Sequence, residues 1–177
     1  SKWPGYTPTP LVDLPEIAAH CGVARVVYKD ESTRLGLGAF KALGGAYAVA
    51  DLVREQVAKG ANVGEVTVAT ATDGNHGRSV AWGAQLAGCN AKIYIHEHVS
   101  RAREAAMQAY GAEVIRVQGN YEVSLADCRA DAKANGWHLV SDTSWEGYVD
   151  VPRAIMAGYT VMGRESIDQL GDCLLYT

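Results

Sequence analysis

The chain has 177 residues, of which 48% are hydrophobic and 20% are charged, and its formal net charge is -4. This length suits one domain or two small lobes and allows a substantial core. The negative charge and the lack of a basic cluster argue against a nucleic-acid partner. No apolar run approaches the ~20 residues of a membrane span and the start does not resemble a signal peptide, so we expect a cytoplasmic protein with no membrane contact.

The first sixty residues predict an extended arm, a short helix, a strand and a long helix. Four of the five prolines lie in the first fifteen residues, which favours an extended start. A helix is expected at residues 15–20 and a strand at residues 24–29. From Lys41 onward apolar residues recur with a helical period, so a long helix is expected to end near residue 59.

After residue 60, strands and helices alternate. Strands are expected at residues 65–70, 92–95, 113–117 and 137–141, and helices at 77–87, 100–110, 121–134 and 151–170. Such alternation produces βαβ units, which build a parallel sheet with right-handed crossovers. The pattern therefore predicts an α/β fold.

Two polar loops follow predicted strands, at the edge of the sheet where α/β proteins bind ligands. The first loop carries Asp73, Gly74, Asn75, His76 and Gly77. Free N–H groups at the helix start can hold an anion or a polar ring substituent, but a plain turn with a capping side chain explains the loop equally well. The second loop begins with Asp142, which suits a general base and equally a helix cap or a polar loop.

Lys41 stands among small residues at the start of the long helix. A lysine removed from water loses proton affinity and becomes a nucleophilic amine, as Schiff-base chemistry requires. A surface lysine whose stem covers apolar neighbours is the plainer interpretation. The local pattern leaves both open.

Other kinds of site find little support. His96 and His98 are expected at the rim of the sheet, and they lack further metal ligands. The four cysteines are far apart, so no metal site is predicted and the thiols are expected to be reduced and buried. Gly36-Leu37-Gly38 lacks the third glycine of a dinucleotide loop, and no serine-nucleophile motif is present.

Four segments together resemble the fold-type II pyridoxal-phosphate enzymes, the tryptophan synthase β-like family. They are residues 6–11 (YTPTPL), 29–32 (KDES), 39–46 (AFKALGGA) and 73–77 (DGNHG), similar to P-T-P-L, K-x-E, S-F-K-x-R-G-A and S-G-N-H-[GA]. The resemblance implies a three-layer α/β fold with a parallel sheet. It also implies pyridoxal 5'-phosphate as cofactor, with Lys41 as the Schiff-base residue and Asn75 on the cofactor's phenolic oxygen. Gly74, His76 and Gly77 would complete the cofactor loop.

Residues 73–78 and 142–148 are similar to the diaminopropionate ammonia-lyases in particular. In that family the aspartates matching Asp73 and Asp142 are taken as the bases for the D and L substrates. The resemblance implies a homodimer that eliminates ammonia from 2,3-diaminopropionate, a small amino acid, to give pyruvate. A serine or threonine dehydratase is an alternative, and Asp73 argues against it because dehydratases carry a small residue there.

Members of this family are longer, and their phosphate-binding loop lies beyond the last residue of this chain. Residues 1–60 are therefore expected to form an incomplete part of a large domain, 61–165 a complete small domain, and 166–177 a truncated return segment. Since the phosphate provides much of the cofactor's anchoring, a non-catalytic fragment that self-associates is a second alternative.

Overall fold

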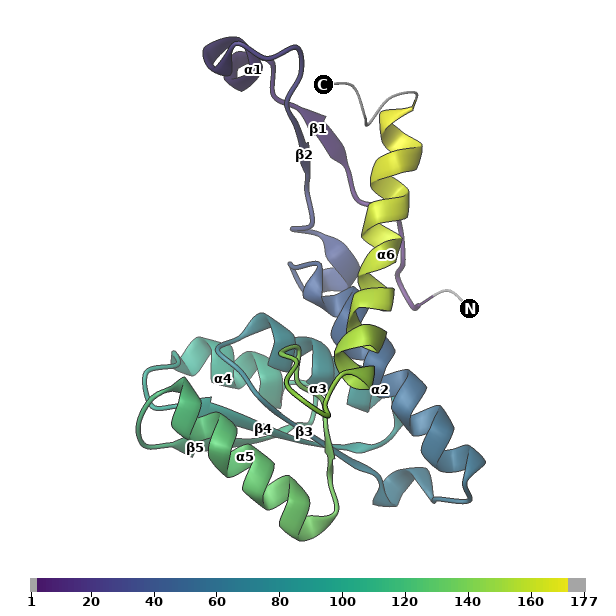
Figure 1. Ribbon diagram of the computed structural model, residues 1–177, viewed down its shortest axis with the longest axis vertical. Helices are drawn as coiled ribbons and strands as arrows, with labels where there is room; N and C mark the ends of the chain where they lie inside the picture. Colours follow the sequence, from purple (N-terminus) through teal and green to yellow (C-terminus); the bar gives the residue numbers. More distant parts are fainter. Residues whose placement is uncertain (1–2, 172–177) are drawn as a thin grey trace. The chain divides into compact units, whose positions relative to one another are not determined.

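The computed structural model describes residues 3–171, and the chain divides into two compact units (Figure 1). One unit comprises residues 41–159, and the other comprises residues 1–40 with residues 160–177. These divisions differ from the domain boundaries expected after residues 60 and 165. The long helix α2 (Lys41–Ala58) packs on the helix of the first βα unit and so falls in the same compact unit as the sheet.

The larger unit contains a four-stranded parallel sheet. Its strands are β3 (Thr67–Ala71), β4 (Asn90–His96), β5 (Glu113–Val117) and β6 (His138–Leu139), in the spatial order β5-β4-β3-β6. From β3 the chain moves outward to β4 and β5, and it then returns to the other side of β3 to form β6. Ligands of open α/β sheets bind beyond the strand ends where the order reverses in this way. Here that point lies between the loops that follow β3 and β6.

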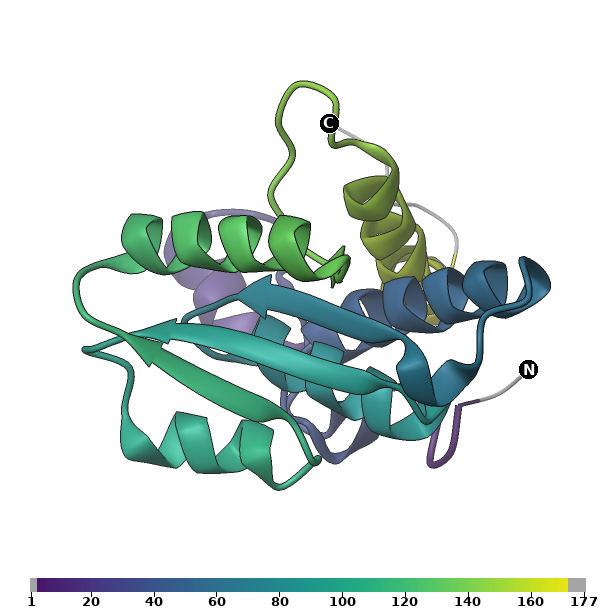
Figure 2. The ribbon, with the colours of Figure 1, turned by 90° about the horizontal axis from the view of Figure 1, so that it is seen from below.

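Helices cover both faces of the sheet, which confirms the predicted three-layer α/β fold (Figure 2). Helix α5 (Tyr121–Asn135) covers one face over a small core that includes Tyr94 and Cys128. Helices α3 (Asn75–Ala87) and α4 (Arg101–Gln108) cover the other face, over a larger core built mainly from valine, isoleucine and alanine. The short 3-10 helix η2 (Val63–Glu65) leads into β3.

Helices α2 and α3 approach each other closely because glycines lie at their contact. A Cβ atom on Gly83 would lie 2.7 Å from the Cα atom of Ala46, and one on Gly45 would lie 1.9 Å from the Oγ atom of Ser79. A side chain at Gly83 would require the backbone of α2 to move, and one at Gly45 would require the Ser79 side chain to move. This contact fixes the start of α2, and therefore Lys41, beside the loop that opens α3.

The smaller unit contains a two-stranded antiparallel sheet of β1 (Leu11–Asp13) and β2 (Val27–Lys29). Helix α1 (Pro15–Cys21) connects them, and the 3-10 helix η1 (Arg34–Gly36) follows. Helix α6 (Asp150–Leu170) contributes its residues to both units. The sequence predicted an extended arm where β1 lies, and it predicted longer strands than β2 and β6.

A buried ion-pair cluster, here called the Arg34 cluster, joins Tyr6, Lys29, Glu31, Arg34 and Glu165 within the smaller unit. The guanidinium of Arg34 donates two hydrogen bonds to Glu31 (2.7 and 2.8 Å) and two to Glu165 (2.8 and 2.7 Å). Tyr6 donates to Glu165 at 2.7 Å, and Lys29 pairs with it at 2.8 Å. Burial alone would raise the pKa of Glu165, but the hydrogen bonds from Arg34, Lys29 and Tyr6 lower it to about 2.

Three cysteines lie in the described part of the chain, all as free thiols. Cys128 is buried and Cys89 is half-buried, but Cys21 is exposed at the end of α1, so the expectation of a buried thiol was wrong there. Cys173 lies outside the described residues. Within residues 3–171 no helix is both long enough and apolar enough to cross a membrane.

Candidate active site

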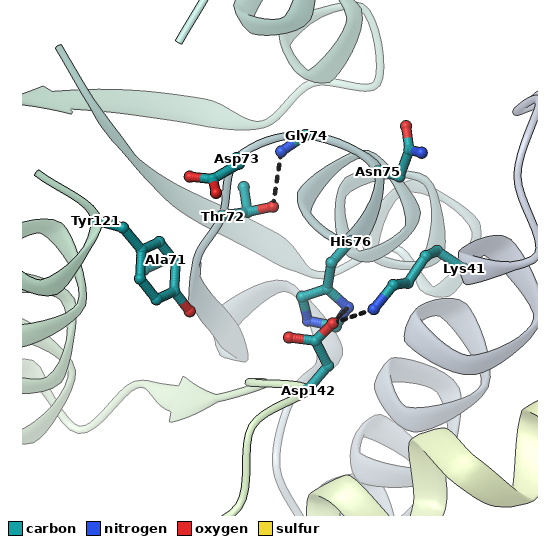
Figure 3. Close-up of a pocket in the computed structure, with 9 residues that line it drawn as sticks. All are labelled: Lys41, Ala71, Thr72, Asp73, Gly74, Asn75, His76, Tyr121 and Asp142. Carbon is teal, nitrogen blue, oxygen red and sulfur yellow. Dashed lines mark hydrogen bonds and ion pairs between the residues drawn. The ribbon is translucent and has the colours of Figure 1, made fainter. Parts of the chain in front are cut away.

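A cavity of about 260 Å³ opens in the larger unit, at the ends of β3 and β6 (Figure 3). Its lining comes from four segments: Lys41, Ala71, Thr72, Asp73, Gly74, Asn75, His76, Tyr121 and Asp142. The structure therefore brings together Lys41, the loop of Asp73 and Asn75, and Asp142, three places that lie far apart in the chain. Of the predicted site residues, Gly77 alone does not line this cavity.

The β3–α3 loop is held by Thr72, whose importance the sequence did not reveal. The Oγ1 atom of Thr72 accepts hydrogen bonds from the backbone N–H groups of Gly74 (3.0 Å) and Gly77 (3.1 Å). A Cβ atom on Gly77 would lie 2.3 Å from the Cγ2 atom of Thr72. The absence of a side chain at Gly77 therefore lets the loop close on Thr72. Threonine residues next to turns often accept such hydrogen bonds. The presence of a threonine at this position was the one signal in the sequence.

Lys41 and Asp142 form an ion pair in the cavity (Figure 3). The Lys41 side chain is 30% exposed and that of Asp142 is 23% exposed, so the expected desolvation of the lysine is only partial. Burial alone would raise the pKa of the Asp142 carboxyl. The charge that His76 acquires at acid pH, together with the hydrogen bond and charge of Lys41, outweighs burial and holds that pKa below its usual range.

His76 is buried beside this pair and is 5% exposed. Its Nε2 atom lies 2.8 Å from the carbonyl oxygen of Val140, so Nε2 carries the proton and donates. Its Nδ1 atom lies 3.8 Å from Oδ2 of Asp142 and has no hydrogen-bond partner. Burial lowers the pKa of His76, and the ring is neutral near pH 7 with an open lone pair at Nδ1. The sequence selected His76 only as a member of its loop, whereas in the structure its side chain also lines the cavity.

The loop that carries Asp142 is fixed by Tyr148. The hydroxyl of Tyr148 donates to the carbonyl of Leu139 (2.9 Å) and accepts from the N–H of Ser141 (2.8 Å). Burial raises the pKa of Tyr148 to about 12, and its ring stacks on Trp145 with centroids 4.1 Å apart. The polar, aromatic loop seen in the sequence is thus a support that holds Asp142 in place.

Asp73 lies on the side of the cavity near Tyr121, whereas the carboxylate of Asp142 is directed to Lys41 and His76 (Figure 3). The side chain of Asp73 is 61% exposed, and its Oδ1 atom lies 3.0 Å from Nε2 of His96. Tyr121 was expected only as the start of a helix, and nothing in its local pattern marks it as a cavity residue.

Comparison with known proteins places this site in a family. The family model described as pyridoxal-phosphate dependent enzyme matches residues 2–175. The chain belongs to the pyridoxal-phosphate dependent enzymes. This confirms the resemblance drawn from the four sequence segments, together with the α/β fold.

Two relatives and one solved structure show the similarity within this pyridoxal-phosphate family. The diaminopropionate ammonia-lyase of Escherichia coli (strain K12) is 43% identical over 180 residues, which cover 96% of this chain and 45% of that protein. An L-threonine dehydratase of Staphylococcus aureus is 30% identical over 162 residues, covering 92% of this chain and 42% of the dehydratase. The crystal structure of holo diaminopropionate ammonia lyase from Escherichia coli superposes with a TM-score of 0.90 at 43% identity, covering 96% and 46% of the two chains. The chain spans about half the length of these relatives.

The residues of the cavity fit the family's cofactor. Pyridoxal 5'-phosphate needs an amine for its aldehyde and polar groups around its ring. Lys41 presents the amine at the cavity wall, and His76 presents a buried nitrogen without a hydrogen-bond partner. Asn75 and the N–H groups at the start of α3 lie at the same opening.

Proposed function

We propose that this chain carries the lysine and the two bases of a diaminopropionate ammonia-lyase, an enzyme that converts 2,3-diaminopropionate to pyruvate and ammonia. One observation carries the proposal: Lys41, Asp73 and Asp142 line a single cavity at the reversal point of the sheet. Pyridoxal 5'-phosphate, when bound, supplies the electron sink that stabilises negative charge on the substrate's Cα atom.

The protein's own groups prepare this chemistry. Lys41 would hold the cofactor covalently, while Asn75, Gly74 and His76 would surround its ring. The Nζ atom of Lys41 donates to Oδ2 of Asp142, so the carboxylate is in place to take a proton from the amine. The neutral His76 next to it adds no second positive charge at pH 7, which would otherwise oppose that of Lys41.

Two carboxylates suit two substrate enantiomers. The α-hydrogens of D- and L-diaminopropionate project to opposite sides when the other substituents are held alike, so each enantiomer needs a base on its own side. Asp73 and Asp142 leave different loops and lie on different sides of the cavity (Figure 3). One of them removes the α-proton, the Cβ–N bond breaks, and ammonia leaves. The resulting enamine hydrolyses to pyruvate and a second ammonia.

Two alternatives remain from the sequence. The identity of 30% to an L-threonine dehydratase supports a dehydratase that acts on serine or threonine. A non-catalytic fragment that self-associates is the other alternative. The homodimer, the cytoplasmic location and the assignment of residues 1–60 and 166–177 to a larger domain stay part of the proposal.

Absorbance spectroscopy and a pyruvate assay test the proposal. On adding pyridoxal 5'-phosphate we expect a new band near the visible edge, which Lys41→Ala abolishes. We expect pyruvate from D- and L-diaminopropionate, and little from serine or threonine. Asp73→Asn should reduce turnover of the D enantiomer, and Asp142→Asn that of the L enantiomer, each by roughly 100-fold or more, as for a lost general base. A wild-type chain that gives no band contradicts the proposal, and preference for serine or threonine favours the dehydratase.

A further inference from the structure

His96 ends strand β4, next to β3, whose following loop carries Asp73. Its Nε2 atom lies 3.0 Å from Oδ1 of Asp73, a hydrogen-bonding distance. The two side chains differ in freedom, because His96 is 17% exposed whereas Asp73 is 61% exposed. The ring of His96 is thus largely enclosed. The exposed carboxylate of Asp73 would be free to rotate in solvent without this contact.

The backbone at His98 decides which nitrogen of His96 carries the proton. The N–H of His98 donates to Nδ1 of His96 at 3.2 Å. A nitrogen that accepts a hydrogen bond has a free lone pair, so the proton of the neutral ring is on Nε2. The protonated Nε2 is therefore the nitrogen that lies 3.0 Å from the Asp73 carboxylate.

The loop that carries His96 is itself held in place. Arg116, on the neighbouring strand β5, donates from Nη1 to the backbone carbonyls of His96 (3.4 Å), Glu97 (2.7 Å) and Val99 (2.8 Å). Its Nη2 atom pairs with Glu104 of α4 at 2.6 Å. A guanidinium anchored in this way keeps residues 96–99 in one conformation. The backbone that carries the His96 ring is therefore fixed.

The backbone and the side chain of Asp73 are held separately. The backbone carbonyl of Asp73 accepts a hydrogen bond from Nη1 of Arg103 at 3.1 Å, which fixes the loop. The carboxylate of Asp73 lies against Nε2 of His96, at 3.0 Å. We propose that His96 is a positioning residue that holds Asp73 for proton transfer, and that it acts selectively on the enantiomer that Asp73 serves. The selectivity rests on the proposed function, whereas the contact between His96 and Asp73 does not.

Selectivity for one enantiomer distinguishes a positioning residue from a contact that only connects two loops. A hydrogen bond that orients a base affects only the steps in which that base takes the proton. Loss of a contact that only connects two loops would instead disturb the whole β3–α3 loop, including Asn75. Turnover of both enantiomers would then fall alike. The ratio of D to L turnover is therefore the deciding quantity.

The first arm of the test needs no cofactor. Long-range proton–nitrogen NMR of the cofactor-free chain at pH 7 reads the tautomer of each histidine, and His96→Gln assigns the signals of His96. We expect the neutral form protonated at Nε2, with its Nε2 and Hε2 signals displaced in Asp73→Ala. The form protonated at Nδ1, or His96 signals that are unchanged in Asp73→Ala, would overturn the proposal.

The second arm compares turnover of the two diaminopropionate enantiomers. We expect His96→Ala to lower the ratio of D to L turnover about tenfold, the effect of one lost hydrogen bond to a charged group. His96→Gln should restore most of the ratio, because its amide N–H replaces the donor. His20→Ala, at an exposed histidine on α1, should leave the ratio unchanged.

Equal losses for both enantiomers in His96→Ala would refute the positioning role. A wild-type chain that turns over neither enantiomer counts against the proposed function, and the NMR arm then decides alone whether His96 holds Asp73.

Discussion

Replacing Glu165 by Gln removes one negative charge from the Arg34 cluster and leaves the side-chain shape nearly unchanged. The cluster lowers the pKa of Glu165 from 4.5 to about 2. Since a pKa change of one corresponds to ~1.4 kcal/mol, the charged form contributes about 3 kcal/mol to folding. The Glu165 side chain is 6% exposed, so solvent screens this contribution little. We expect Glu165→Gln to lower the free energy of unfolding by about 3 kcal/mol at pH 7.

The pH dependence gives this prediction its sign. A carboxyl group whose pKa is lowered by folding stabilises the protein above its unfolded pKa, near 4.5, and loses that effect as the pH falls toward its folded pKa of about 2. Urea unfolding followed by circular dichroism should therefore show the difference between wild type and variant closing between pH 4.5 and pH 2. Glu55→Gln, in an exposed pair with Lys59, should cause no comparable loss. Equal stabilities at pH 7, or a difference that persists unchanged at pH 2, would refute the reasoning.

Two further predictions concern the larger unit. Gly83→Ala places a Cβ atom 2.7 Å from the backbone of α2 and should lower the free energy of unfolding by about 1–3 kcal/mol. Gly64→Ala, whose nearest atom would be 3.8 Å away, is the matched control in urea unfolding, and equal effects would contradict the packing argument. Thr72→Val removes the acceptor of two backbone N–H groups, so amide exchange of Gly74 and Gly77 should accelerate at least tenfold. Unchanged exchange would show that Thr72 does not hold the loop.

Helix positions could be predicted from the sequence because their start and stop signals are local. Ser100 accepts a hydrogen bond from the N–H of Arg103 and caps α4, a position that serine favours. Gly22, Gly88 and Gly136 end three helices in the left-handed conformation that glycine adopts most readily. Each of these signals acts within one turn of helix, so no knowledge of the rest of the fold was needed.

The strands of the smaller unit were harder to predict because their pairing is not local. Strand β1 exists through its ladder with β2, where Leu11 lies opposite Lys29. Its three residues lie among prolines and show no clear alternation, so the sequence alone favoured an extended arm. The Arg34 cluster depends in the same way on Glu165, which comes from the far end of the chain.

The same contrast between local and non-local signals applies to the candidate site. Lys41, Asp73 and Asp142 could be selected by their motifs, and the reversal of strand order then explains why they meet. The place of His96 beside Asp73 could not be predicted, because it depends on the register between β3 and β4. The buried lone pair of His76 depends likewise on the carbonyl of Val140, beyond the end of β6.

The central claim, that Lys41 is the residue that binds pyridoxal 5'-phosphate, is tested most directly by covalent trapping. The chain is incubated with the cofactor, reduced with borohydride and digested, and the modified lysine is identified by mass spectrometry. We expect a phosphopyridoxyl group on Lys41 at one equivalent of cofactor, with little on the exposed Lys59, and no such labelling in Lys41→Ala. Labelling spread over exposed lysines, with Lys41 modified no more than Lys59, would contradict the account.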